Sequence, residues 1–99
     1  MDSLITLIKK TYSFNDILEQ VETETQTEVF ASLRSVSRQE FAAAGQLGLS
    51  PEFMALTNAA NYSGEKVAIV NGERFAIYRT FRPNDSDDIE LYCQREVGA

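Results

Sequence analysis

The stretch Val67–Arg79, VAIVNGERFAIYR, decides the fold because it encodes a complete β-hairpin. Two apolar runs flank Asn71-Gly72, a pair that readily adopts the two positive φ angles of a type I′ turn. In this register, one face of the hairpin is formed by Ala68, Val70, Phe75 and Ile77. The opposite face is formed by Val67, Ile69, Ala76 and Tyr78. Because both faces are apolar, one can fill a core while the other must be covered by a helix or by another chain.

The segment Val21–Glu28 alternates threonine with glutamate or glutamine, and this period of two predicts a strand. Neither of its faces is suited to a core, so we expect an arm in solvent or a sheet edge protected by charge. The alternation then becomes apolar on one side, at Val29, Ala31 and Leu33. A single long strand is therefore expected to run from solvent into the core.

Three other segments have the composition and alternation of strands. They are Leu4–Tyr12, Glu52–Ala59, with Phe53, Ala55 and Thr57 on one face, and Ile89–Gln94, with Ile89, Leu91 and Cys93 on one side. The segment Phe14–Gln20 contains Asn15-Asp16 and some apolar residues, and it is expected to form a loop or turn.

One short helix is predicted over Arg38–Leu47. Ser37 precedes Glu40 by the spacing of a capping box, and Gly48 stands where helices commonly end. The apolar stripe of this helix is narrow, and an isolated helix of this length is marginal in water. It must therefore dock on its own barrel or on a neighbouring subunit.

The order of these elements favours a mainly β fold, either a small antiparallel β-barrel or a sandwich, with about six strands and one short helix in an insertion. The 99 residues suffice for one domain, 1–99. No apolar run approaches the length of a membrane span, and no membrane association is expected.

The composition gives little support to catalysis. The chain has no histidine, the commonest general base and a frequent metal ligand, so we expect no enzymatic activity, no cofactor and no metal site. Cys93 is expected to be a small core residue rather than a reactive thiol. The acidic loop of Asp85, Asp87, Asp88 and Glu90 lacks the glycine and terminal glutamate of an EF-hand and is expected to be solvated.

The formal net charge of −6 disfavours binding of nucleic acid through its phosphates. One group of residues, Arg74, Tyr78, Arg79 and Phe81, nevertheless has the mixture found in single-strand-binding modules. We expect its arginines to pair with the acidic strands, since acids outnumber bases. A small OB-like or SH3-like module acting as a monomer is kept as the alternative.

Several stretches, taken in order, resemble the head-closure family of long-tailed bacteriophages, also called stopper or head–tail adaptor proteins. The resemblance covers nearly the whole chain, and none of its motifs is a catalytic signature. The residues that carry it are ITLIKKTYS near the start, TETQTEVFASLRSVSRQEFAAAGQLGLSPEF, NYSGEKVAIVNGERFAIYRTFR and DIELYCQRE.

This resemblance implies a β-barrel that assembles as a homo-oligomeric ring in the virion, after synthesis in the host cytoplasm. The ring would lie below the portal and adaptor proteins, close the channel around packaged DNA and present a docking face to the tail. The insertion Ser35–Phe53 would reach inward or onto a neighbour, and the Val21–Glu28 arm would meet the adaptor or the adjacent subunit. The expected interface residues are Arg38, Glu40, Phe41, Gln46, Leu47 and Leu49 in the insertion and Glu22, Glu24 and Glu28 in the arm. A tail-completion or tail-terminator protein is a second alternative.

Overall fold

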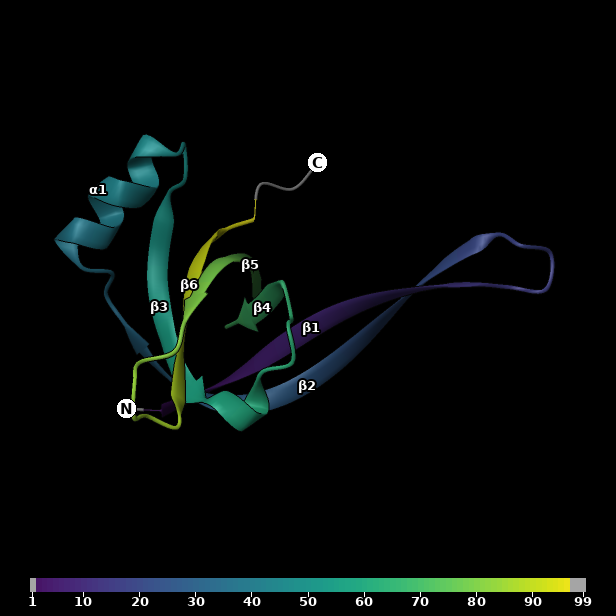
Figure 1. Ribbon diagram of the computed structural model, residues 1–99, viewed down its shortest axis with the longest axis horizontal. Helices are drawn as coiled ribbons and strands as arrows, with labels where there is room; N and C mark the ends of the chain where they lie inside the picture. The colour runs from purple at the N-terminus through teal and green to yellow at the C-terminus, as the bar shows by residue number, and fades with distance from the viewer. Residues whose placement is uncertain (1, 97–99) are drawn as a thin grey trace.

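The computed structural model describes residues 2–96, and its strands dominate the fold (Figure 1). A nine-residue helix and a single 3₁₀ turn are the helical elements of the described chain. In chain order the elements are β1 (Asp2–Phe14), β2 (Gln20–Arg34), α1 (Arg38–Gln46), β3 (Pro51–Asn58), the 3₁₀ turn η1 (Ala59–Asn61), β4 (Val67–Val70), β5 (Glu73–Phe81) and β6 (Asp88–Arg95).

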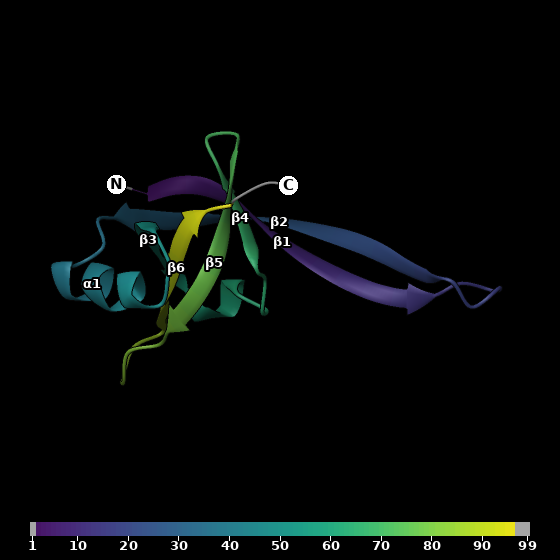
Figure 2. The ribbon, with the colours of Figure 1, turned by 90° about the horizontal axis from the view of Figure 1, so that it is seen from above.

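The six strands form one closed antiparallel barrel in the order β1-β2-β3-β6-β5-β4. Strand β1 closes the ring because it pairs with β2 on one side and with β4 on the other, where Thr6 lies opposite Ile69. Figure 2 shows β4, β5 and β6 beside the base of the long β1–β2 pair. The prediction of a small, mainly β barrel with one short helix is therefore confirmed.

The hairpin formed by β4 and β5 has the predicted turn. Asn71 and Gly72 have φ angles of 52° and 81°, and Val70 lies opposite Glu73. The face of Ala68, Val70, Phe75 and Ile77 is the buried one. The opposite face is only partly covered: Val67 is buried, while Ile69, Ala76 and Tyr78 are half-buried. The hairpin therefore supplies the core on one side and leaves an incompletely covered wall on the other.

The core fills the barrel with inward side chains from all six strands. Phe53 and Phe75 meet edge to face with ring centroids 4.8 Å apart, a favourable aromatic geometry. Cys93 is fully buried, as predicted, and burial raises the pKa of its thiol to about 12. The buried members are Ile5, Leu7, Val29, Ala31, Ala55, Ala68, Val70, Phe75, Ile77, Leu91 and Cys93.

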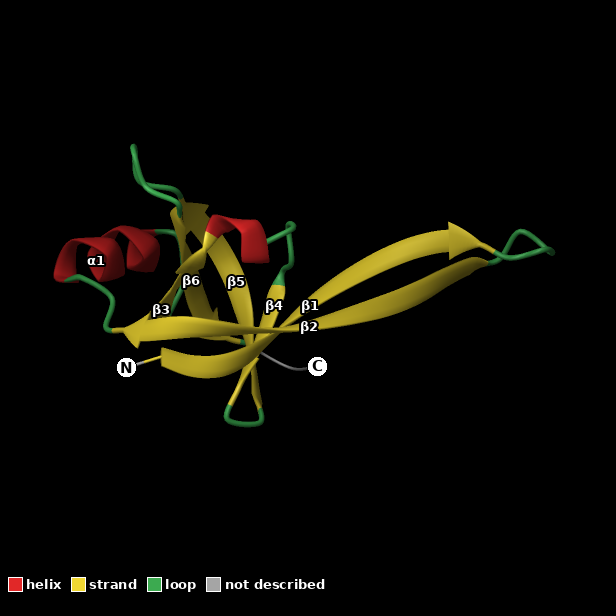
Figure 3. Ribbon diagram, turned by 90° about the horizontal axis from the view of Figure 1, so that it is seen from below, coloured by secondary structure: helices red, strands yellow, loops and turns green. Residues whose placement is uncertain are grey.

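The β1–β2 pair continues beyond the barrel as a two-stranded arm, defined here as residues 9–25. Pairing runs unbroken from Lys9 opposite Thr25 to Phe14 opposite Gln20, about 20 Å at ~3.3 Å per residue. Every residue from Lys9 to Glu28 is exposed, so the predicted solvent strand is confirmed. Figures 1 and 3 show the arm and α1 at opposite ends of the molecule, whose extents are 50 × 30 × 27 Å.

The structure corrects several predicted boundaries. β1 is longer than Leu4–Tyr12, because it also forms one side of the arm. The helix ends at Gln46, with Leu47 as its C-cap. The predicted insertion Ser35–Phe53 is too long, because Pro51 and Phe53 pair with β6 and belong to the barrel. Among residues 2–96, no helix is long and apolar enough to cross a membrane.

Candidate interaction surfaces

Helix α1 has well-defined ends because its caps satisfy backbone groups that the helix leaves unpaired. Ser37 Oγ accepts a hydrogen bond from the Glu40 amide at 3.1 Å, as the capping spacing predicts. At the other end Leu49 N donates to Ala44 O and Gly48 N donates to Gly45 O, which together form a Schellman motif. Gly48 has a φ of 80°, the left-handed conformation that this motif requires. The insertion is thus an ordered helix on the barrel wall.

A β-bulge in β5 lies where this helix contacts the barrel. Ile77 lies opposite Cys93 but Arg79 lies opposite Tyr92, so one extra residue, Tyr78, is inserted into β5. Such a bulge lets two successive side chains reach the same side of a sheet. Tyr78 Oη donates to Glu40 Oε2 at 2.9 Å, and Arg79 pairs with both carboxylate oxygens of Glu40. We call this group, Glu40, Tyr78 and Arg79, the helix clasp.

The contacts in the clasp favour the charged form of Glu40. Burial works to raise the pKa of Glu40, whose side chain is 13% exposed, but hydrogen bonds from Arg79 and Tyr78 outweigh it and lower the pKa. Burial and the bond to Glu40 raise the pKa of Tyr78, so its hydroxyl remains a donor. The Arg79 guanidinium also lies over the Tyr92 ring, 4.2 Å from its centroid. The carboxylate is therefore charged and fully engaged at neutral pH.

Little else of α1 is buried. Ala44 is 3% exposed, whereas Phe41 is 57% and Leu47 is 78% exposed. At 100° per residue, Phe41 and Leu47 lie about 60° to either side of Ala44, so they flank the contact between α1 and the barrel. Arg38 and Gln46 are exposed, and Leu49 is half-buried. The helix thus presents two large apolar side chains that its own barrel does not cover.

The three predicted glutamates of the arm strand are also exposed. Glu22 pairs with Lys10 across the arm at 3.4 Å, and Glu24 pairs with Arg74 of β5 at 3.8 Å. The second contact ties the arm to the barrel, although exposed pairs like these contribute about 0–1 kcal/mol. Glu28 lies opposite Thr6 on the outer wall. The predicted interface residues therefore lie in three places: on α1 and the residues that follow it, on the arm, and, for Glu28, on the outer wall of the barrel.

The structure reveals a surface that the sequence analysis missed, the apolar tip of the arm. Asn15 Oδ1 accepts hydrogen bonds from the amides of Ile17 and Glu19, at 3.1 and 2.9 Å, and Leu18 has a φ of 62°. This geometry fixes the turn and directs its side chains outward. Phe14, Ile17 and Leu18 are 71%, 72% and 80% exposed. The sequence contained a signal for this surface, because apolar residues are unusual in a turn between two polar strands.

A depression of about 360 Å³ opens at the end of the barrel away from the arm. It lies between the end of β2, the start of β3 and the β4–β5 turn, and we call it the mouth pocket. Its floor is apolar, with Leu33, Phe53, Val70 and Phe75, and Arg34 lies among its lining residues. Sequence analysis assigned these apolar residues to the core and did not anticipate that the barrel would be open there.

The outer wall of β1 and β2 carries a smaller apolar patch. Leu4 and Phe30 lie directly opposite each other and are 52% and 66% exposed. Cross-strand neighbours of this kind contact each other, so the two side chains form one patch. This wall lies on the part of the barrel that α1 does not cover.

The proposed basic and aromatic face is largely occupied. Arg74 pairs with Glu24 and Glu96, each at 3.8 Å, and Arg79 is held by Glu40. The prediction that these arginines pair with the acidic strands is confirmed for Arg74, whose partner Glu24 lies in β2, whereas Arg79 pairs with Glu40 of α1. These carboxylates would compete with phosphates for the two guanidinium groups, whose side chains remain 39% and 43% exposed. Within the part of the chain that is described, no three His, Cys, Asp or Glu side chains gather as they would around a metal ion.

Comparison with models of known protein families gave no match, and no curated protein matches the chain.

Proposed function

We propose that this protein is a structural component of the head–tail connector of a bacteriophage or prophage. It assembles as a ring below the portal and adaptor proteins, closes the DNA channel and offers a docking face to the tail. Its place is the virion, and its partners are other copies of itself, the adaptor above and tail proteins below. The chain acts as a mechanical part, with no catalytic step.

One observation carries the proposal: a barrel with a complete core of its own holds large apolar side chains outward on projecting elements. Phe41 and Leu47 project from α1, and Phe14, Ile17 and Leu18 project from the arm. Exposed apolar groups on separate faces are typical of proteins that contact several partners. Resemblance to the head-closure family gives these contacts a specific setting.

The charge of the chain agrees with this setting. A formal net charge of −6 repels the phosphates of packaged DNA, which suits a channel that DNA must cross without adhering. The clasp adds a positioning role for Glu40, which holds α1 at a fixed place on the barrel wall. Phe41 and Leu47 are then available to a neighbour in a defined orientation.

Deleting the gene in the phage or prophage that encodes the protein tests this function. The expected result is heads that fill with DNA but lose it, together with tails that remain unattached. Complementation with the wild-type gene should restore infectious particles, and Phe41→Asp should not. Asn84→Asp, which adds the same charge to an exposed loop, is the matched control and should restore them. Normal particles from the deletion strain would exclude the proposed function.

A further inference from the structure

We propose that the apolar tip of the arm inserts into the mouth pocket of a second copy of this chain. This inference rests on the proposed function and deepens it, because it identifies how one subunit grips the next. The donor is the turn with Ile17 and Leu18, and the acceptor is the depression floored by Phe53 and Phe75.

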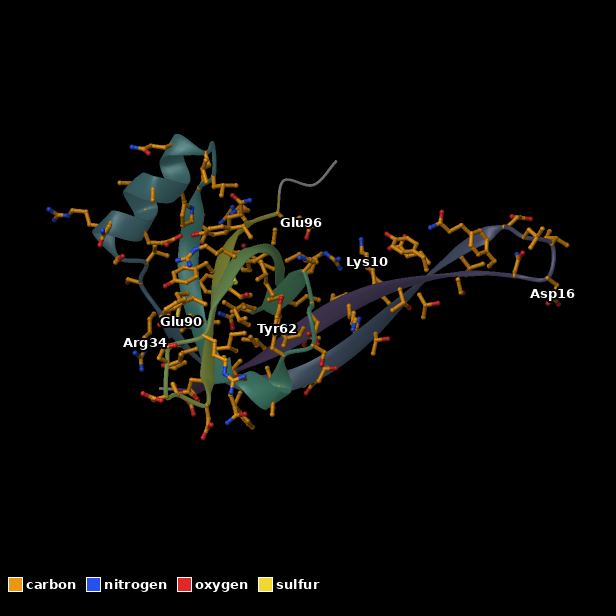
Figure 4. The ribbon with its side chains drawn as sticks, in the orientation of Figure 1. Lys10, Asp16, Arg34, Tyr62, Glu90 and Glu96 are labelled. Carbon is orange, nitrogen blue, oxygen red and sulfur yellow. The ribbon has the colours of Figure 1, made fainter. Side chains whose placement is uncertain are left out.

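The two surfaces lie at opposite ends of one molecule. Strand β1 runs from the barrel toward the arm, while Val70 and Arg34 lie at the ends of β4 and β2 that point away from it. Figure 4 shows Asp16 at the arm tip and Arg34 at the far end of the structure. The tip therefore cannot reach its own pocket, and the contact must be made between copies.

The reach of the arm agrees with a neighbour of the same size. The arm extends about 20 Å at ~3.3 Å per residue, and the second-longest extent of the molecule is 30 Å. An arm laid along an adjacent copy would thus extend past the middle of that copy. A donor and an acceptor at opposite ends make a heterologous contact, which forms a ring when the rotation between copies closes.

The chemistry of the two surfaces is complementary. Aliphatic side chains at the tip match the apolar floor of the pocket. The tip also carries Asp16 and Glu19, for which the described chain provides no ion-pair partner. Arg34, at the pocket, likewise has no carboxylate partner among residues 2–96. The two glutamates at the pocket, Glu52 and Glu73, share one partner, Arg95, so the four charges around the pocket sum to zero, and Arg34 is the one among them without an ion-pair partner in residues 2–96.

Disulfide trapping between two tagged versions of the full chain tests the contact. The donor carries Gln20→Cys, next to the tip, and the acceptor carries Ser35→Cys, at the pocket. The control acceptor carries Asn84→Cys, in the exposed β5–β6 loop. The native Cys93 is fully buried and stays out of the reaction. Mixing under mild oxidation should give a donor–acceptor product with Ser35→Cys in clear excess over Asn84→Cys.

A second substitution in the donor separates specific docking from chance collision. Leu18→Asp should lower the yield of the Ser35→Cys product about tenfold or more, because it places a charge where the proposed contact would bury a leucine side chain. Thr25→Asp places the same charge on the shaft of the arm and should leave the yield unchanged. Equal yields from the two acceptors, or a yield insensitive to Leu18→Asp, would overturn the inference.

The outcome is distinguishable from failure of the proposed function. If deletion of the gene leaves heads and tails unjoined but no specific disulfide forms, the connector role stands and the arm contacts another protein, such as the adaptor. If the disulfide forms but the deletion strain makes normal particles, the chain self-assembles for a different purpose.

Discussion

Removing one hydroxyl group from the helix clasp should loosen α1 without unfolding the barrel. Tyr78 Oη donates to Glu40 Oε2 at 2.9 Å, whereas the nearest alternative donor to that oxygen, Arg79 Nε, lies at 3.5 Å. A hydrogen bond to a charged group contributes about 1.5–3 kcal/mol. Because Arg79 still compensates the carboxylate in Tyr78→Phe, we expect a loss near the lower limit, about 1.5 kcal/mol.

The assay is amide hydrogen exchange in α1, measured by NMR. A loss of ~1.4 kcal/mol changes an equilibrium constant tenfold, so the α1 amides of Tyr78→Phe should exchange about tenfold faster. Exchange in the core strands β3 and β6 should change much less, since the side chain lies on the outer wall and is half-buried.

Tyr92→Phe is the matched control. Its hydroxyl donates to Glu90 at 2.6 Å on the same wall, but it makes no hydrogen bond to the helix. α1 exchange should therefore stay at the wild-type rate in Tyr92→Phe. Equal rates in wild type and Tyr78→Phe, or equal acceleration in both variants, would refute the idea that the clasp holds α1.

Three other predictions concern the pH dependence of the clasp, the C-terminal end of α1 and the exposed side chain of Phe41. Because the pKa of Glu40 is lowered in the folded state, the clasp contributes stability above the ordinary glutamate pKa, and this stability is lost as pH falls through the folded value. An NMR titration should place the midpoint of Glu40 below the ordinary glutamate pKa, and the substitution Arg79→Gln should raise that midpoint. Gly48→Ala should lower the unfolding free energy by about 1–2 kcal/mol, because alanine is strained at a φ of 80°, while Gly45→Ala inside the helix should raise it by about 0.5–1 kcal/mol, as urea unfolding would show. Phe41→Ala should keep the unfolding free energy of the barrel within about 1 kcal/mol of wild type and should weaken assembly. Leu91→Ala, at a fully buried site, should lower the unfolding free energy by about 2–5 kcal/mol. Early melting with normal assembly in Phe41→Ala would show that Phe41 is an ordinary core residue.

Local sequence signals predicted most of the fold because each depends on neighbouring residues alone. Asn71-Gly72 specifies a turn through its φ preferences, and Ser37 with Gly48 delimits a helix through backbone caps. Residues 21–33 showed the change from solvent to core because strand faces alternate strictly. Closure of the barrel by β1 and β4 has no local signal, since it depends on the twist and register of the whole sheet.

The candidate surfaces were less predictable for the same reason. The exposure of Phe41 and Leu47 follows from where α1 sits, and this depends on a bulge at Tyr78 that no residue pattern announces. Glu40 was expected at an interface between chains, and the structure shows it binding Tyr78 and Arg79 of its own chain. The arm tip was predicted only as a loop, because the length of the arm that isolates it emerges from the pairing of β1 with β2.

The most direct test of the connector proposal is electron microscopy of the purified protein mixed with the portal–adaptor complex of its own phage or prophage. The proposal predicts a ring of additional density on the lower face of the adaptor, with the arm of each subunit lying against its neighbour. Particles identical to the portal–adaptor complex alone, at protein concentrations that saturate any specific site, would contradict it.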